Sequence, residues 1–114
     1  MPKVFIVEKP KNNIDVSKAE DFGEIIYLFN QNERRLGVFE CMTFGLDVIN
    51  KINEKGGFQL NDSFLTAGAQ IPVAIAFAAI ISKWPNVLVL LYNAKQDMYV
   101  QRRIVSSRWR TKDD

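Results

Sequence analysis

The chain contains no histidine and only one cysteine among its 114 residues, and these two deficits limit its chemistry. A Ser-His-Asp triad, a Cys-His dyad and a histidine-ligated zinc or haem all need residues that the sequence lacks. The single cysteine, Cys41, has no partner for an intrachain disulfide, which is typical of a protein of the reducing cytoplasm. We therefore expect a cytoplasmic protein with no metal site and no cofactor.

Long apolar runs are also lacking. The opening MPKVFIVEK has no basic segment followed by a longer apolar stretch, so it does not resemble a signal peptide. Residues 63–82 carry no charge, but polar residues, glycine and proline interrupt the first half of this segment. Its solid apolar part, residues 73–81, is too short to cross a bilayer, and we expect no membrane contact.

The charges of the chain nearly balance. Fifteen basic and thirteen acidic residues give a formal net charge of +2, which leaves nucleic acid open as a partner without favouring it. The distribution is less even, because the segment from Gln101 onward holds five basic residues and its only acids are the last two residues. A solvated chain end and an anion-binding rim are both compatible with this pattern.

Short apolar runs alternate with helical patterns along the chain. Strands are predicted over residues 4–7, 25–29, 63–66, 87–92 and 98–105, and helices over residues 17–22, 41–55 and 73–82. This order favours an α/β fold: a mainly parallel four- to five-stranded sheet with helices on both faces and a C-terminal antiparallel hairpin. The last strand alternates polar and apolar residues, as edge strands do. We expect a single α/β domain over residues 1–105 and a basic C-terminal tail over residues 106–114.

Two of the predicted helices carry more specific expectations. Ser17 and Glu20 have the spacing of a capping box, with Gly23 available to end the first helix. Residues 73–82 are apolar nearly all round, so this helix is expected to be central and buried. Pro72 stands where a helix tolerates proline, in the first turn.

The candidate ligand site is the turn before that helix. Thr66, Gly68 and Gln70 lie between a predicted strand and the helix N-terminus, where free N–H groups and the helix dipole favour an anion. No G-x-G-x-x-G or P-loop motif is present, so a tight structural turn is the alternative interpretation. Cations of other loops can face the same rim, and we name four of them as candidate ligand contacts: Arg34, Arg35, Arg102 and Arg103.

No catalytic set emerges from the remaining residues. The carboxylates have no recognisable metal or glycosidase spacing, and Cys41 is interpreted as a small buried residue. Near the end of the chain, Arg108, Trp109 and Arg110 place an aromatic ring between two cations. A subunit or partner interface, a loose tail and a ligand contact are the three interpretations of this triplet.

The layout of the chain resembles a known family of small bacteriophage proteins. The similarity lies in Val4–Val7, in the run Ser17–Leu28, and in Val89–Tyr92 together with Tyr99–Arg102. These elements are similar in spacing to the Thoeris anti-defence sponges, and the resemblance does not extend to residues 30–59. It implies a non-enzymatic homo-oligomer in the host cytoplasm that binds a phosphate-containing signal, such as a cyclic nucleotide or a cyclic ADP-ribose isomer, without cleaving it.

Two other functions stay open at this point. One is an interaction protein that docks on a host factor through the basic, Trp109-containing tail. The other is a histidine-free ring nuclease that cleaves a nucleotide with a lysine, tyrosine or carboxylate as its acid or base.

Overall fold

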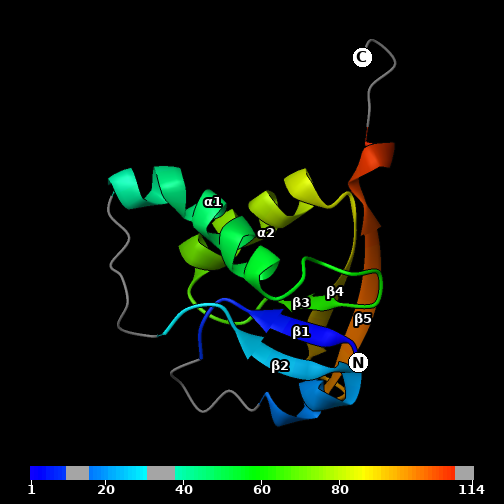
Figure 1. Cartoon of the computed structure of the whole chain (residues 1–114). Coiled ribbons are helices and arrows are strands. Elements are labelled where there is room, and N and C mark those ends of the chain that lie inside the picture. The colour runs from blue at the N-terminus through cyan, green and yellow to red at the C-terminus, as the bar shows by residue number, and fades with distance from the viewer. Residues whose placement is uncertain (10–15, 31–37, 110–114) are drawn as a thin grey trace.

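A computed structural model gives the fold of the chain and describes residues 1–9, 16–30 and 38–109 (Figure 1). The elements follow in the order β1 (Lys3–Ile6), η1 (Ser17–Phe22), β2 (Glu24–Tyr27), α1 (Val38–Glu54), β3 (Ser63–Leu65), α2 (Gln70–Lys83), β4 (Asn86–Asn93), β5 (Met98–Val105) and η2 (Ser106–Arg108). Both η elements are short 3-10 helices.

The five strands form one sheet in the order β2-β1-β3-β4-β5. The first four strands are parallel to one another, and β5 pairs antiparallel with β4 in a hairpin. The predicted α/β fold, with a mainly parallel sheet and a closing hairpin, is therefore confirmed. The half-polar β5 lies at the edge of the sheet, as its alternating pattern predicted.

Helices cover both faces of the sheet, but unequally. α1 and α2 pack against each other on one face, which we call the helix face, whereas η1 contacts β1, β2 and β5 on the opposite face (Figure 1). This division follows from the handedness of parallel crossovers. The chain moves one way in the sheet from β1 to β2 and the other way from β2 to β3 and on to β4, so the connecting helices must lie on opposite faces.

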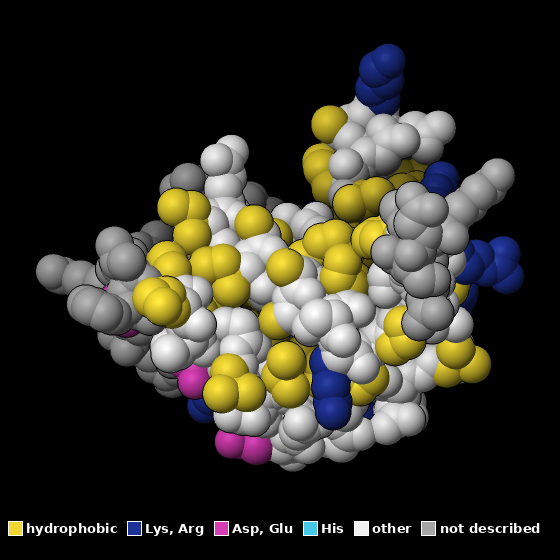
Figure 2. Space-filling view, turned by 90° about the horizontal axis from the view of Figure 1, so that it is seen from above, with side chains coloured by type: hydrophobic (Ala, Val, Ile, Leu, Met, Phe, Trp, Pro, Cys, Tyr) yellow, Lys and Arg dark blue, Asp and Glu magenta, His cyan; other side chains and the backbone are white. Residues whose placement is uncertain are grey.

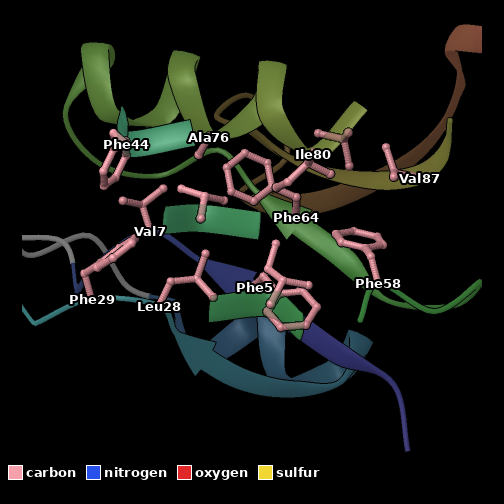
Figure 3. Packing of buried hydrophobic residues seen from close by; sticks show 13 residues of the cluster. Phe5, Val7, Leu28, Phe29, Phe44, Phe58, Phe64, Ala76, Ile80 and Val87 are labelled. Carbon is pink, nitrogen blue, oxygen red and sulfur yellow. The ribbon is translucent and has the colours of Figure 1, made fainter. Parts of the chain in front are cut away.

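Most of the core lies on the helix face. Thirteen of the described residues form one buried cluster there, and Figure 3 shows their side chains filling the space between the helices and the sheet. Phe5 and Phe64 rise from adjacent strands, and Phe44, Ala76 and Ile80 come down from the helices. Aromatic pairs join these layers; the rings of Phe64 and Phe77 stack with centroids 6.4 Å apart.

The opposite face carries a smaller core. Six buried side chains form its cluster: Val4, Ile6, Ala19, Leu65, Leu90 and Tyr99. η1 reaches the cluster through Ala19 and ends at Gly23, whose φ is 152°. A Cβ at Gly23 would lie 2.5 Å from the carbonyl oxygen of Pro2, so this close approach of η1 to β1 requires glycine. The prediction that Gly23 ends the first helix is thereby confirmed.

Two sequence expectations about helices are wrong. Ser17 is the first residue of η1 rather than its N-cap, which the capping box requires; the N-cap is Val16, and it makes no side-chain cap hydrogen bond. α2 begins at Gln70 and is not buried all round, because only Ala76 and Ile80 are buried. The five-stranded sheet offers α2 one packing surface, so its outward side is exposed despite its apolar sequence. Pro72 does lie in the first turn.

The amino end of the sheet is fixed by a buried carboxylate. Asp62, which is 2% exposed, accepts hydrogen bonds from the backbone N–H groups of Lys3 and Gln59, both at 2.8 Å. Because β3 follows directly, this aspartate ties the loop before β3 to the start of β1. In the part of the chain that the structure describes, no helix is long and apolar enough to span a membrane.

Candidate functional site

The candidate site lies between β1 and β3, where the connections that leave the two strands lead to opposite sides of the sheet. β1 and β3 are neighbours, yet the connection after β1 leads to one side of the sheet and the connection after β3 leads to the other. In open α/β sheets, such a switch point opens a crevice at the carboxyl ends of the two strands, where ligands bind. Here the two segments that flank it are Glu8–Lys9 after β1 and residues 66–69 after β3.

The turn after β3 exposes backbone donors. Thr66, Gly68 and Gln70 are all exposed, and Gly68 has a φ of 126°, a conformation that favours glycine. A Cβ at Gly68 would meet only Val73 Cγ2, at 3.5 Å, so the outer side of the turn is open among the described residues. The structure therefore brings together the three predicted residues of this turn.

The start of α2 adds to the donors of the turn. Its N-cap is Ala69, and no described side chain caps it. The N–H of Val73 bonds to the Ala69 carbonyl at 3.1 Å, and Pro72 has no N–H. The N–H groups of Gln70 and Ile71 are the remaining donors of the first turn, at the positive end of the helix dipole. The arrangement suits an oxygen of an anionic ligand.

The β4–β5 hairpin borders this turn on one side. β4 continues to Asn93, beyond Leu90, the residue that pairs with Leu65 at the end of β3. The Asn93 side chain accepts hydrogen bonds from the backbone of Lys95 and Gln96, which orients the hairpin tip. Sequence reasoning located the hairpin but missed that it places Lys95 at the carboxyl end of the sheet. The direction of β4, which is parallel to β3, is the signal that could have found it.

A polar network joins the hairpin to η1 at the same end of the sheet. Lys18 Nζ lies 2.7 Å from Asp97 Oδ2, and the Tyr92 hydroxyl donates a hydrogen bond to Asp97 Oδ1. The hydrogen bond to Asp97 raises the pKa of Tyr92, and the hydrogen bond from Lys18 lowers the pKa of Asp97. All three side chains are exposed, so the network is a surface contact that joins η1 to the hairpin, and we call it the clasp.

The predicted arginines do not gather at this turn. Arg103 donates to Asn86 Oδ1 at 2.8 Å and to the Leu60 carbonyl at 3.4 Å, which places its guanidinium at the amino end of the sheet. Arg102 lies mid-strand opposite Val89 and donates to the Gln101 carbonyl. Arg103 lies away from the turn because β5 runs antiparallel to β4, and a ligand role for either arginine stays a prediction. Arg34 and Arg35 lie outside the described residues.

The aromatic-cationic triplet also lies at the far end of the molecule. Arg108 closes η2 and Trp109 follows it; both are exposed, and Arg110 lies outside the described residues. Ser106 anchors this segment to the end of α2 through a hydrogen bond to the Ile81 carbonyl at 3.2 Å. The turn at Gly68 lies at the opposite end of α2, so the triplet and the turn are separate candidate surfaces.

Two hollows lie away from the switch point. One, of about 230 Å³, lies between β2 and the end of α1 and is lined by Lys51, Glu54 and Lys55 among others. The second, of about 480 Å³, lies beside the loop of Asp62 at the amino end. Across residues 1–9, 16–30 and 38–109, no cluster of three or more metal-ligating side chains is present. The candidate site in the described part of the chain is thus the exposed turn of residues 66–70.

Comparison with known proteins identifies a matching protein family. Residues 2–105 match the family of phage Pam3 gp32-like proteins. The chain belongs to the phage Pam3 gp32-like family. The match spans every strand from β1 to β5 and the helices between them, so the family similarity covers the whole sheet and the switch point. No curated protein and no solved structure matches the chain.

Proposed function

We propose that this phage protein is a non-enzymatic binding protein that sequesters a phosphate-containing small ligand of the cyclic nucleotide class. The observation that carries the proposal is the position of residues 66–70 at the switch point of the sheet. Small side chains there allow a ligand to approach the backbone, and the first turn of α2 presents N–H donors to a phosphate oxygen. Thr66 and Gln70 supply side-chain hydrogen bonds beside it.

The charge around this turn supports an anionic ligand. Lys9 follows β1, Lys95 lies at the hairpin tip, and the dipole of α2 points its positive end at the turn. A sequestered immune signal is the ligand that the resemblance to the Thoeris anti-defence sponges implies. The expected partner is thus a cyclic nucleotide or a cyclic ADP-ribose isomer of the infected host.

The experiment is capture and release of an intact ligand. Purified protein is incubated with a panel of cyclic mononucleotides, cyclic dinucleotides and cyclic ADP-ribose isomers, washed, and denatured by heat, and the supernatant is analysed by mass spectrometry. Sequestration predicts stoichiometric recovery of one intact compound. A cleaved product would instead favour the ring nuclease, and failure to retain any compound overturns the proposal.

A charge change at Gln70 tests the location of the site. Gln70→Glu adds a negative charge at the first position of α2. The helix dipole stabilises this charge, but the charge repels a bound phosphate. We expect about tenfold weaker binding or more, without loss of stability. Asn61→Asp is the matched control, because it changes the net charge equally on an exposed residue at the other end of the sheet. Equal affinities of the two variants would exclude this turn as the site.

Docking on a host factor is the second candidate function, and the exposure of Trp109 favours it. This side chain is 61% exposed next to Arg108, and tryptophan and arginine are enriched at interfaces. Truncation after Ser107 would remove both residues while leaving the sheet complete. A single stoichiometric host partner that is retained by the full chain and lost by the truncated chain supports this function; equal retention by both chains excludes it.

A further inference from the structure

The outward side of α2 is apolar although it faces away from the core. No charged residue occurs between Gln70 and Ser82. Ala76 and Ile80 are buried against the sheet, whereas Ala74 and Ala78 are exposed and Ile71 is 61% exposed. A helix that is apolar on all sides is ordinarily buried on all sides. The core of one chain accounts for only the inner side of α2.

α1 extends this apolar surface. Met42 and Leu46, one turn apart, are 77% and 61% exposed on its outward side. The two helices pack closely, since a Cβ at Gly45 of α1 would lie 3.3 Å from Ala79 Cβ of α2. Figure 2, which views the molecule from the helix side, shows hydrophobic side chains distributed over both helices. We call this surface the outer helix patch; it comprises Met42, Leu46, Ile71, Ala74 and Ala78.

We propose that the outer helix patch is the contact surface of a homodimer, in which α2 of one copy packs against α2 of a second copy across a two-fold axis. The charge pattern of this surface is the reason for proposing a second copy of the chain as the partner. In a two-fold contact the same surface meets itself, so a charged residue near the axis faces its own like charge. A surface that contacts its own copy must therefore be free of charge near the centre.

The exposed residues of both helices meet this requirement. From Met42 to Asn53 of α1, the exposed residues are Met, Thr, Leu and Asn, and from Gln70 to Ser82 of α2 they are Gln, Ile, Ala and Ser. The fully exposed charges of these helices stand at or near their ends, at Glu40, Glu54 and Lys83, and two half-buried charges, Asp47 and Lys51, lie within α1. The outward side of α2, where the two-fold axis would lie, carries no charge from Gln70 to Ser82, so two copies can meet along it without facing like charges. It also offers a charged partner no ion pair.

The sizes of the side chains also suit two packed helices. Ala74, Ala78 and Ser82 are spaced by four residues and form one shallow strip along α2. Such a strip lets two helices approach toward the short end of the usual spacing of about 8–10 Å. The larger Ile71, Met42 and Leu46 lie beside the strip and supply apolar area that the contact removes from water.

Oligomeric state measured by analytical ultracentrifugation on ligand-free protein tests the proposal. The wild-type chain is expected to be a dimer. Ala78→Glu places like charges across the axis, and Leu46→Glu buries a charge in the apolar border of the contact; each should weaken dimerisation by at least about 100-fold. Leu60→Glu is the matched control, because Leu60 is 62% exposed in a loop outside the patch while Leu46 is 61% exposed within it. Its dimerisation constant should equal that of the wild type.

A second measurement avoids introduced charges. In a Cys41→Ser background, Ala74→Cys and Ala78→Cys place single thiols on the strip, and a thiol near the axis should form an intermolecular disulfide on mild oxidation. Leu60→Cys should stay monomeric on a non-reducing gel. A monomeric wild type, or a dimer that persists in both glutamate variants with no cross-link from either α2 cysteine, overturns the proposal. Neither assay involves a nucleotide, so the dimer and the ligand proposals can fail independently.

Discussion

The two faces of the sheet differ in the size of their buried core. The helix face holds thirteen of the described buried residues under two α-helices, with aromatic rings from strands and helices in contact. Among the described residues, the opposite face holds six buried ones, and the 3-10 helix η1 covers part of it. Since stability scales with the apolar area removed from water, most of the folding free energy must come from the helix face.

The difference extends to the outer surfaces. The cover of the six-residue face is polar: η1 exposes Lys18, Glu20 and Asp21, and an ion pair fastens it to the hairpin. The cover of the helix face is apolar on its outward side, as the outer helix patch shows. A polar outer surface is stable in contact with water, whereas an apolar outer surface favours contact with a further protein layer. This difference is what the proposed dimer contact on the helix face rests on.

The largest expected effect comes from the core of the helix face. Phe64 is fully buried and stacks on Phe77, so Phe64→Ala should lower the free energy of unfolding by about 3–5 kcal/mol. Urea denaturation followed by circular dichroism measures the loss.

The neighbouring residue on β3 provides the comparison. Leu65 is 2% exposed and its side chain enters the six-residue cluster on the other face. Leu65→Ala should cost less, about 2–3 kcal/mol, because a thin cover can collapse over the space left behind. A loss from Leu65→Ala as large as that from Phe64→Ala would contradict the unequal roles of the two faces.

The second prediction concerns the close approach on which the thinner face depends. Gly23→Ala forces a Cβ to within 2.5 Å of the Pro2 carbonyl oxygen and strains a φ of 152°, so it should cost about 2–4 kcal/mol. Gly56→Ala is the control: φ is 95° there, but nothing lies within 4 Å of the added Cβ, and the cost should be about 1–2 kcal/mol. Equal losses in thermal unfolding would show that backbone strain alone accounts for Gly23.

Local elements could be read from the sequence because their signals are local. Strands such as β5 and the stop at Gly23 follow from alternation and from glycine. The turn at residues 66–70 was predictable because strand, small residues and helix follow one another in the chain. Its position at the switch point was not, because the order of strands depends on which distant segments pair.

The errors have the same origin. The end of the sheet at which Arg103 lies could not be read from the sequence, because it depends on the direction of β5. α2 was expected to be buried because its composition is apolar, yet burial depends on how many layers the whole chain can build. In the described part of the chain no further layer covers α1 and α2 on the helix face, so the apolar outward side of α2 is left exposed, and that exposure carries the dimer proposal.

The smallest expected effect concerns the clasp between η1 and the hairpin. The hydrogen bond to Asp97 raises the pKa of Tyr92, so Tyr92 should deprotonate above the ordinary phenol value of about 10. In Asp97→Asn the carboxylate is gone, and the pKa of Tyr92 should return toward that value. Asparagine suits the φ of 50° at this position, so the turn is kept. Absorbance titration of tyrosinate, with Tyr92→Phe to assign the transition, measures the shift.

The sign of the linked stability follows from the two pKa directions. Because the pKa of Tyr92 is raised on folding, its bond to Asp97 contributes fully below about pH 10 and is lost as pH rises through the raised value. Because the pKa of Asp97 is lowered, its contribution is present above its ordinary value and is lost as pH falls through the lowered one. Lys18→Met should weaken the acid side of this window and, because Lys18 lowers the pKa of Tyr92, should raise that pKa further on the alkaline side. An unchanged Tyr92 titration in Asp97→Asn would mean that the hydrogen bond between Tyr92 and Asp97 does not set the pKa of Tyr92.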